Sequence, residues 1–365
     1  MTQPQKSALS VLPESLRPSA RSISRKLRTF LNAVSDRLFF PLWLISQRLR
    51  HGKKIVIVCR PGALGDIICT LPLCGELRKR HPQARFIFLT YRDYKKMALL
   101  SRATDEIYGA KSWLWPFSLS PGYRLPGIVE AIYNPKTTDE LSPNIGPQIH
   151  LIDDMAASCG ATIAGPDRQP RLFPSPEFIK ETQTAYGLAD DLARGRMIIA
   201  INCGRSWPVK EWAAAKWQEL LDKIHADFDA VVLQFGLTTG KEDEYEHLRG
   251  VRFLANRLKS DELVALIAGC HLVISIDSGP VHVAGAVGVP VVGLFGANAP
   301  QFRLPPGSPG IGLFTQLPCI FCHHKTPRGH WQTGCPNDIR CMKELEVQTV
   351  FDAVKTMLPK SGKTS

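Results

Sequence analysis

The chain contains two runs of short, almost entirely apolar segments that alternate with segments of helical spacing. The first run starts at residue 53, where KIVIVCR and ARFIFLTY alternate with the helical patterns DIICTLPLCGELRKRHP, RDYKKMALLSR and IHLIDDMAASCGA. Strands this apolar are typical of a parallel sheet that helices cover on both faces. The pattern therefore predicts an α/β domain.

A second run follows the proline-rich segment GPDRQPRLFPSP, which has the composition of a linker. Its predicted strands are RMIIAINCG, DAVVLQFG, VRFLAN, HLVISID and VPVVGLFG. We expect two doubly wound, Rossmann-like domains that face a cleft. Ligands of such sheets bind outside the carboxyl ends of the strands, so the cleft is the expected site. The predicted parts are a basic leader (1–52), a first domain (53–170), a linker (171–194), a second domain (195–345), and a C-terminal helix and tail (346–365).

The net charge of +12 is concentrated at the start of the chain. Residues 1–54, the leader and the two lysines that follow it, contain eleven Lys and Arg against two acidic residues, so they carry nine of the net charges and the rest of the chain is nearly neutral. Five apolar residues of the leader recur at helical spacing, with arginines elsewhere around the helix: Leu27, Phe30, Leu31, Val34 and Leu38. Pro41 is expected to kink or end this helix.

Two interpretations of the leader stay open. The helix either covers part of the core or lies on an anionic membrane surface. Its apolar run is shorter than the roughly 20 residues that span a bilayer, and it lacks the cleavage site of a signal peptide. Ten cysteines without a secretory signal indicate a reducing compartment, with the cytoplasm as the default.

The first motif is CRPGALGDI, in which a buried strand ends at Arg60 and a helix begins. Gly62 and Gly65 are expected to permit a tight turn that another molecule can approach closely. Asp66 is expected at the helix N-terminus, either as a helix cap or as a general base for an incoming hydroxyl. The motif matches neither a Walker A loop nor the G-x-G-x-x-G dinucleotide pattern.

The second motif is NCGRSWPVKEW, directly after the first strand of the second domain. Gly204, Arg205, Ser206 and Lys210 place backbone and cationic donors where a strand ends, which favours a phosphate ligand. The alternative is a solvated basic loop.

The third motif is DSGPVHVAGAVG, at another strand-to-helix junction. Asp277 and Ser278 could cap the helix, and Gly279 keeps the backbone approachable. The first-turn N–H groups and the helix dipole favour an anion such as phosphate. His282 is ambiguous because a helix histidine is often only packed, and Asp277 suits a sugar hydroxyl better than a phosphate.

Together these motifs resemble the ADP-heptose:lipopolysaccharide heptosyltransferases, glycosyltransferase family nine, which have the two-domain GT-B fold. The resemblance rests on RPGALGDI before a TLP-containing helix, on Lys210 and Trp212 after a glycine-bearing loop, and on DSGPVHVAGAVGVPVVGLFG. It covers roughly residues 53–358 and excludes the leader.

The resemblance implies an inverting transfer without a catalytic cofactor. The first domain would bind a lipid-linked saccharide acceptor, partly through the Trp/Pro-rich loop 111–127, and Asp66 would be the general base. Lys210 would contact donor phosphate, and Asp277, Ser278, Gly279 and His282 would bind the nucleotide-sugar. The other residues expected to help bind the donor are Arg60, Gly62, Gly65, Gly204, Arg205 and Ser206. Such an enzyme would be cytoplasmic, and peripheral on the inner face of the inner membrane if the leader binds lipid.

A cysteine-rich segment, residues 319–341, departs from this pattern. Cys319, Cys322, Cys335 and Cys341 have the spacing C-x2-C-x12-C-x5-C, which could form a structural zinc or iron site with His323, His324 and His330 as spare ligands. Cysteine clusters occur at this place in some members of the family. The alternative is a set of reduced, partly buried thiols.

Two rival functions remain. A nucleotide-sugar epimerase or hydrolase would use the same fold and act on the donor alone. A nucleic-acid-binding protein would use the basic leader and a zinc knuckle, but the nearly neutral body and the lack of interleaved aromatic and basic residues weigh against it.

Overall fold

The first sheet lies in the N-terminal half of the computed structural model, which describes residues 20–111, 125–142, 146–204, 207–236, 247–325 and 334–358, with side chains from residue 27 onward. Within these residues the sheet has four parallel strands in the order β3-β2-β1-β4. They are β1 Ile55–Cys59, β2 Arg85–Tyr91, β3 Glu106–Ala110 and β4 Val129–Tyr133. The sequence pattern did not predict β3 and β4, whose residues are only partly buried.

The second sheet has six described strands, all parallel, in the order β10-β9-β8-β5-β6-β7. Its strands are β5 Met197–Asn202, β6 Ala230–Gln234, β7 Val251–Phe253, β8 Leu272–Ile276, β9 Val291–Leu294 and β10 Gly310–Leu313. All of these except β10 were predicted. The order reverses between β5 and β8, so the carboxyl ends of these two strands lie at the topological switch point.

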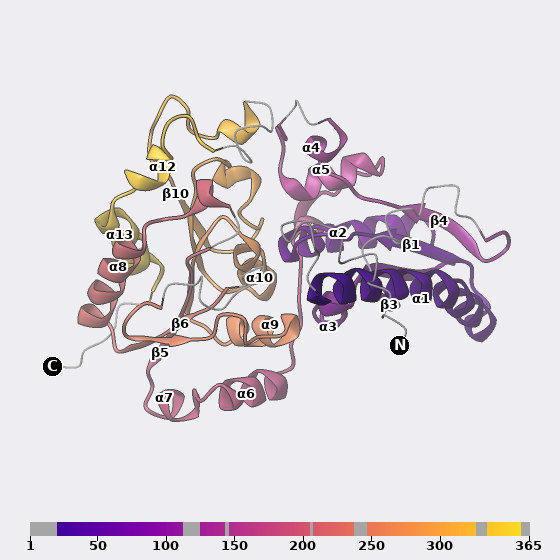
Figure 1. Cartoon of the computed structure of the whole chain (residues 1–365), viewed down its shortest axis with the longest axis horizontal. Helices are drawn as coiled ribbons and strands as arrows, with labels where there is room; N and C mark the ends of the chain where they lie inside the picture. Colours follow the sequence, from indigo (N-terminus) through magenta and orange to yellow (C-terminus); the bar gives the residue numbers. More distant parts are fainter. Residues whose placement is uncertain are drawn as a thin grey trace, which may run out of the picture.

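Helices cover both faces of each sheet (Figure 1). In the first half, α2 (Leu64–Arg80) and α5 (Leu151–Ser158) share a cluster with one face of β1 and β2, and α1 (Ala20–His51) packs on the other face. In the second half, α9 (Ser260–Ala268) and α10 (Gly279–Val287) cover one face, and α8 (Ala214–Asp227) and α13 (Val347–Met357) cover the other. These layers confirm the α/β prediction. The remaining short helices are α3 Lys95–Leu99, α4 Thr138–Leu141 and α12 Arg340–Lys343.

The leader helix α1 covers part of the core, as one of the two interpretations expected. Phe40 and Leu44 are fully buried against the first sheet. The buried carboxylate of Asp36 accepts a hydrogen bond from the N–H of Lys111 at 2.8 Å. These contacts hold the helix on both sides of Pro41, and it continues to His51. Of the two outcomes expected at Pro41, a kink or a helix end, the helix end was therefore wrong.

The segment predicted as a linker contains two helices, α6 (Pro176–Ala185) and α7 (Ala189–Ala193). Helix α6 packs on α9 of the second half. Before α6, the crossing chain is bonded to both halves: the N–H of Leu172 donates to Ala286 O, and that of Phe173 donates to Leu100 O. The crossing is thus held in place by backbone hydrogen bonds.

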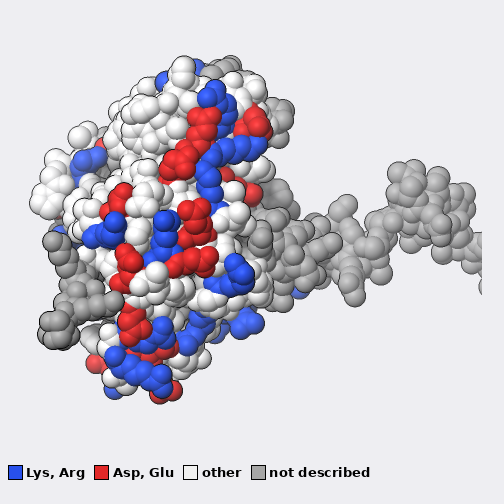
Figure 2. Space-filling model, turned by 90° about the vertical axis from the view of Figure 1, so that its left-hand side faces the viewer, with Lys and Arg blue, Asp and Glu red and all other residues white. Residues whose placement is uncertain are grey.

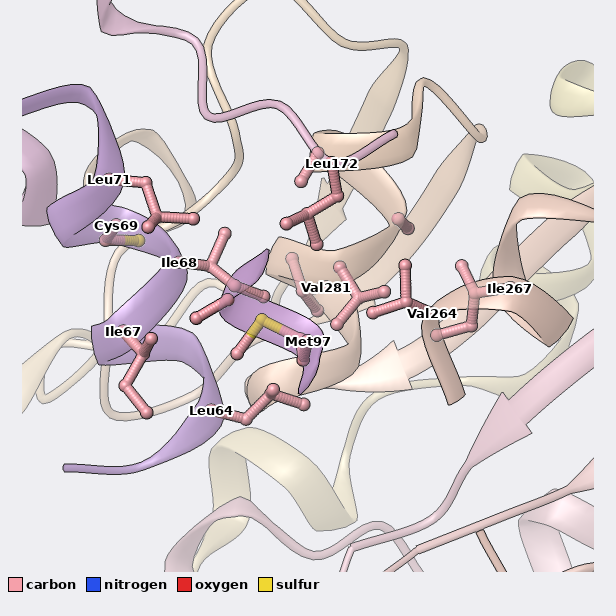
Figure 3. Close-up of a cluster of buried hydrophobic side chains, with 14 of the residues drawn as sticks. Leu64, Ile67, Ile68, Cys69, Leu71, Met97, Leu172, Val264, Ile267 and Val281 are labelled. Carbon is pink, nitrogen blue, oxygen red and sulfur yellow. The ribbon is translucent and has the colours of Figure 1, made fainter. Parts of the chain in front are cut away.

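One apolar cluster joins the two halves (Figure 3). Ile68 and Leu71 of α2 lie opposite Val281 of α10, with Val264 of α9 beside them. The close approach depends on glycine: a Cβ on Gly65 would lie 2.6 Å from Cδ2 of His282, and one on Gly279 would lie 3.1 Å from Cβ of Leu64. Gly62 and Gly65 both have negative φ, so their small size, and not a left-handed turn, makes them fit here.

In the part of the chain that the structure describes, no helix is long and apolar enough to cross a bilayer.

Replacing Gly65 by Ala should lower the free energy of unfolding by about 1–3 kcal/mol, because the new methyl group meets a rigid buried ring. Gly75→Ala is the matched control on the same helix, where nothing lies within 4 Å, and it should be neutral or raise stability by up to about 1 kcal/mol. Denaturant unfolding of both variants measures the difference. Equal effects would contradict the proposed packing role of Gly65.

Candidate functional site

A cavity of about 1390 Å³ lies between the two halves. Its walls contain most of the residues that the sequence motifs singled out: Arg60, Gly65, Asp66, Gly204, Lys210, Asp277, Ser278, Gly279 and His282. Gly62 is not among the residues that line the cavity, and a Cβ at this position would lie 2.9 Å from Asp66 Oδ2. Arg205 and Ser206 lie outside the described residues. Three motifs far apart in sequence thus meet in one cavity.

Asp66 stands in the first turn of α2, three residues after the N-cap residue Ala63. Its carboxylate accepts a hydrogen bond from the N–H of Ala63 at 3.3 Å and pairs with Nη2 of Arg60 at 3.3 Å. The Asp66 side chain remains 31% exposed. The carboxylate of Asp66 is therefore held by protein groups on one side, and its other side is open to the cavity.

Arg60 pairs with other groups of this chain, although it was predicted to help bind the donor. Its Nη1 pairs with Glu140 Oε2 at 2.7 Å and donates to Pro135 O at 2.9 Å. Burial opposes the charge of Arg60, but the carboxylates of Asp66 and Glu140 outweigh burial and raise its pKa. Arg60 is thus a fixed cation that holds the carboxylate of Asp66.

Lys210 and Asp277 form a buried ion pair on the opposite wall. Nζ of Lys210 lies 2.9 Å from Asp277 Oδ2 and also donates to the Asp277 backbone carbonyl at 3.2 Å. Asn298 donates its amide to the same carboxylate. Burial alone would raise the pKa of Asp277, but Lys210, Arg303 and the Asn298 amide hold it well below its usual range. The expected contact of Asp277 with a sugar hydroxyl stays a prediction.

The N-terminal turn of α10 has no side-chain cap, which corrects the expectation that Asp277 and Ser278 would supply one. Ser278 is the N-cap residue, but its hydroxyl accepts a hydrogen bond from Asn202 Nδ2 at 2.6 Å instead. Asp277 is held by Lys210 and Asn298. The turn lines the cavity, so its N–H groups and the helix dipole are available to an anion.

His282 is packed between the halves, and 5% of it is exposed. Its Nδ1 lies 3.3 Å from Sγ of Cys69 in α2. Burial lowers the pKa of His282 to about 3, so the imidazole is neutral at pH 7. It can offer a hydrogen bond to a ligand but no positive charge.

Several cavity residues were missed by the sequence analysis: Asn202, Glu140, Asn298 and Arg303. Asn202 ends β5 and Asn298 follows β9, so the rule that polar residues at strand ends mark a site could have found both. Glu140 lies in the short helix α4, where it forms a capping box with Thr137, and Arg303 follows the 3₁₀ turn Pro300–Phe302, so neither directly follows a strand and this rule marks neither.

Part of the cysteine-rich segment bridges the halves. His323 Nε2 lies 3.8 Å from Asp139 Oδ2, and Gln148 Nε2 donates to the carbonyl of His324. The ring of His324 bonds through Nδ1 to the carbonyl of Pro147 and accepts from the N–H of Ala299 at Nε2. The ring of His324 is thus hydrogen-bonded at both nitrogens, away from the four cysteines, and His330 lies outside the described residues.

The four cysteines, Cys319, Cys322, Cys335 and Cys341, line a separate cavity of about 270 Å³. All four are free thiols. Burial and the neighbouring thiols raise the pKa of Cys341 to about 11. Among the described residues, however, no three His, Cys, Asp or Glu side chains come together as ligands of a metal ion.

The surface shown in Figure 2 carries Lys and Arg interspersed with Asp and Glu. Nucleic-acid-binding proteins concentrate positive charge on one face. This face therefore gives no support to the nucleic-acid-binding alternative.

Comparison with known proteins places the chain in a family. Residues 161–353, more than half of the chain, match the model of "Glycosyltransferase family 9 (heptosyltransferase)". Lipopolysaccharide heptosyltransferase 3 of Escherichia coli is 38% identical over 286 residues, which cover 66% of this chain and 83% of that protein. The chain spans about half the length of other curated relatives, between 42% and 56% for three lipopolysaccharide heptosyltransferases 1 and 2.

Solved structures share the fold at low sequence identity. The family 9 glycosyl transferase of Veillonella parvula superposes with a TM-score of 0.62 at 19% identity, over 83% of this chain and 97% of that one. The iron-containing dodecameric glycosyltransferase TibC of enterotoxigenic E. coli gives 0.61 at 16% identity, over 84% and 76%. TibC is also described as a heptosyltransferase in complex with ADP-D-β-D-heptose. With two parallel-sheet halves around one cavity, and with these matches, the chain belongs to glycosyltransferase family 9, the heptosyltransferases.

Proposed function

We propose that this glycosyltransferase transfers a heptose from ADP-heptose to a lipopolysaccharide-type, lipid-linked saccharide, with inversion at the anomeric carbon. The observation that carries the proposal is the arrangement of the cavity walls. An oriented, partly exposed carboxylate, Asp66, lies on the first half, and an uncapped helix turn with Lys210 beside it lies on the second. One wall can bind an acceptor hydroxyl and the other a diphosphate.

In the proposed reaction the acceptor hydroxyl gives its proton to the carboxylate of Asp66. The acceptor oxygen forms a bond to the anomeric carbon while the bond from that carbon to the phosphate oxygen breaks, and ADP leaves with the electron pair. A single displacement of this kind inverts the configuration. Arg60 keeps Asp66 oriented, while Lys210 and the N–H groups of α10 stabilise the charge that grows on the diphosphate. The proposal assigns the charge stabilisation to these protein groups and includes no catalytic cofactor.

Asp66→Asn should reduce transfer from ADP-heptose by about 10²- to 10⁴-fold and leave the affinity for ADP within about threefold, because the amide keeps the shape but cannot accept the proton. Asp93→Asn is the control, since Asp93 is another carboxylate of the cavity wall. Product formation with a lipopolysaccharide-core acceptor and calorimetric titration with ADP measure the two effects. Unchanged turnover in Asp66→Asn would reject the base assignment, and donor conversion without acceptor would favour the epimerase or hydrolase.

We also propose that α1 holds the enzyme on the cytoplasmic face of an anionic membrane. The helix has an exposed apolar stripe opposite its buried face, with the stripe side chains between 39% and 79% exposed: Leu27, Phe30, Leu31, Val34, Leu38, Leu42 and Leu49. At 100° and 1.5 Å per residue these positions share one side of the helix over about 33 Å. The stripe includes all five residues that the sequence analysis singled out.

The charges around the stripe fit an anionic lipid surface. Arg28 and Arg37 are exposed on its two flanks, and the single acidic residue of α1, Asp36, is buried on the opposite side. Asn32 of the same helix lines the cavity, so a membrane under α1 would lie next to the acceptor side. A basic amphipathic helix of this kind lies in the lipid interface.

The double variant Leu31→Glu/Leu38→Glu should bind vesicles of 70% phosphatidylcholine and 30% phosphatidylglycerol at least about tenfold more weakly than the wild type, since it loses apolar area and gains negative charge. Leu99→Glu is the matched control, an exposed leucine outside α1. Co-sedimentation measures binding. The proposal would be contradicted if the wild type did not bind these vesicles. It would also be contradicted if gel filtration showed a dimer in which the stripe is buried.

We propose further that the four cysteines hold a structural zinc or iron ion, a proposal supported by the shared fold of TibC, an iron-containing glycosyltransferase. Four thiols around one cavity suit a tetrathiolate site, although their present positions do not bring three of them together as ligands. Raised thiol pKa values mean that a metal would displace protons on binding. Such a site would fix the segment that reaches across to Asp139 and Pro147, without a catalytic role.

Elemental analysis of protein purified without chelator should find about one zinc or iron per chain. Cys319→Ser/Cys322→Ser should lose the metal and lower the melting temperature, because the loop loses its cross-link. Cys159→Ser, outside the cluster, should keep both. A metal-free wild type would show that the cysteines are reduced thiols.

A further inference from the structure

Arg303 lines the cavity but has no role in the proposed reaction. It follows the 3₁₀ turn Pro300–Phe302, beyond the carboxyl end of β9, and lines the cavity. Its Nη2 donates to Asn298 Oδ1 at 3.3 Å. Its Nε is buried, and in the described part of the chain no hydrogen-bond partner is present for it. A buried donor without an acceptor is unfavourable, so this N–H indicates room for an acceptor from a ligand.

The other two cations near the reacting groups already have carboxylate partners. Arg60 pairs with Asp66 and Glu140, and Lys210 pairs with Asp277. Among the residues that the structure describes, Arg303 has no carboxylate within ion-pair distance, and its contact is a neutral amide. Its charge is therefore the least compensated of the three.

Arg303 also lies close to the uncapped turn of α10. Asn298, which accepts its hydrogen bond, donates to Asp277, and Asp277 directly precedes Ser278 and Gly279. The positive charge of Arg303 contributes to the lowered pKa values of Asp277 and His282, as expected for a near neighbour. The guanidinium is thus placed beside the turn where an anion is expected.

The Arg303 loop faces the first half of the molecule. The next residue, Leu304, accepts a hydrogen bond at its carbonyl from Nε2 of His150 at 2.9 Å, and His150 is the N-cap residue of α5. The sugar of the donor must reach Asp66 on that same half. The phosphate that bears the sugar is therefore the part of the diphosphate nearest to Arg303.

We propose that Arg303 binds the sugar-bearing phosphate of the nucleotide-sugar through Nε and a neighbouring Nη, and stabilises that phosphate as the sugar leaves. The inference rests on the proposed nucleoside diphosphate donor. A guanidinium presents two parallel N–H groups to a phosphate, which an ammonium cannot do. Arg303→Lys keeps the charge and loses this geometry, and Arg303→Gln loses both.

Calorimetric titration of the full-length protein with ADP and with AMP tests the role, because only ADP carries the second phosphate. The wild type should bind ADP more tightly than AMP. Arg303→Gln should weaken ADP binding by about 10- to 100-fold and Arg303→Lys by a smaller factor, with AMP affinity within about twofold in both. Lys96→Gln, which removes a cation at the cavity wall on the first half, should leave the ratio of ADP to AMP affinity unchanged.

Three other results would each overturn this inference, alone or together with the proposed donor. Equal loss of ADP and AMP affinity in the Arg303 variants would overturn the proposal and assign Arg303 a structural role. Unchanged ADP affinity with a wild type that prefers ADP would overturn this inference alone. A wild type that binds neither nucleotide would overturn the proposed donor together with it. The melting temperature of both variants checks folding, and the lysine variant carries the test if the glutamine variant unfolds.

Discussion

The packing of α2 against α10 fixes the geometry on which the rest of the molecule depends. Two glycines bring these helices together, Gly65 beside His282 and Gly279 beside Leu64. The contact continues into an apolar cluster that both halves share. Because Asp66 follows Gly65 and Ser278 precedes Gly279, the contact also sets how far apart the two chemical groups stand. Fold stability and site geometry are thus determined by the same residues.

The charges of the site are arranged in two separate groups of ion pairs. On one wall Arg60 holds Asp66 and Glu140, and on the other Asp277 holds Lys210 with help from Asn298. The Lys210–Asp277 pair is neutral, and the group around Arg60 carries one net negative charge, so the cation in each group has a carboxylate partner before a substrate enters and the penalty of burial is limited. His282, packed between the halves beside Gly65 and Cys69, is neutral and adds no charge to the cavity wall. A diphosphate would therefore meet preformed donors and need little reorganisation of the protein.

Much of the fold could be read from the sequence because its central strands are buried on both faces, as in β1, β5 and β8. The less buried edge strands β3, β4 and β10 lack that signal and were missed. In the site, Asp66, Lys210 and Asp277 were predictable because each follows a strand end. Arg303 was not, since only tertiary contacts bring its loop to Asp277 and His150. The sequence also did not show that α1 continues past Pro41, because this depends on how Phe40 and Leu44 pack on the sheet.

The contacts of the cysteine-rich segment also affect how substrates enter and leave the cavity. The halves meet not only at α2 and α10 but also where His324 bonds to the carbonyl of Pro147 and Gln148 bonds to the carbonyl of His324. Widening the cavity by rotation about the helix contact would stretch or break this second connection. If spent nucleotide leaves by such a rotation, these hydrogen bonds between the halves would have to open first.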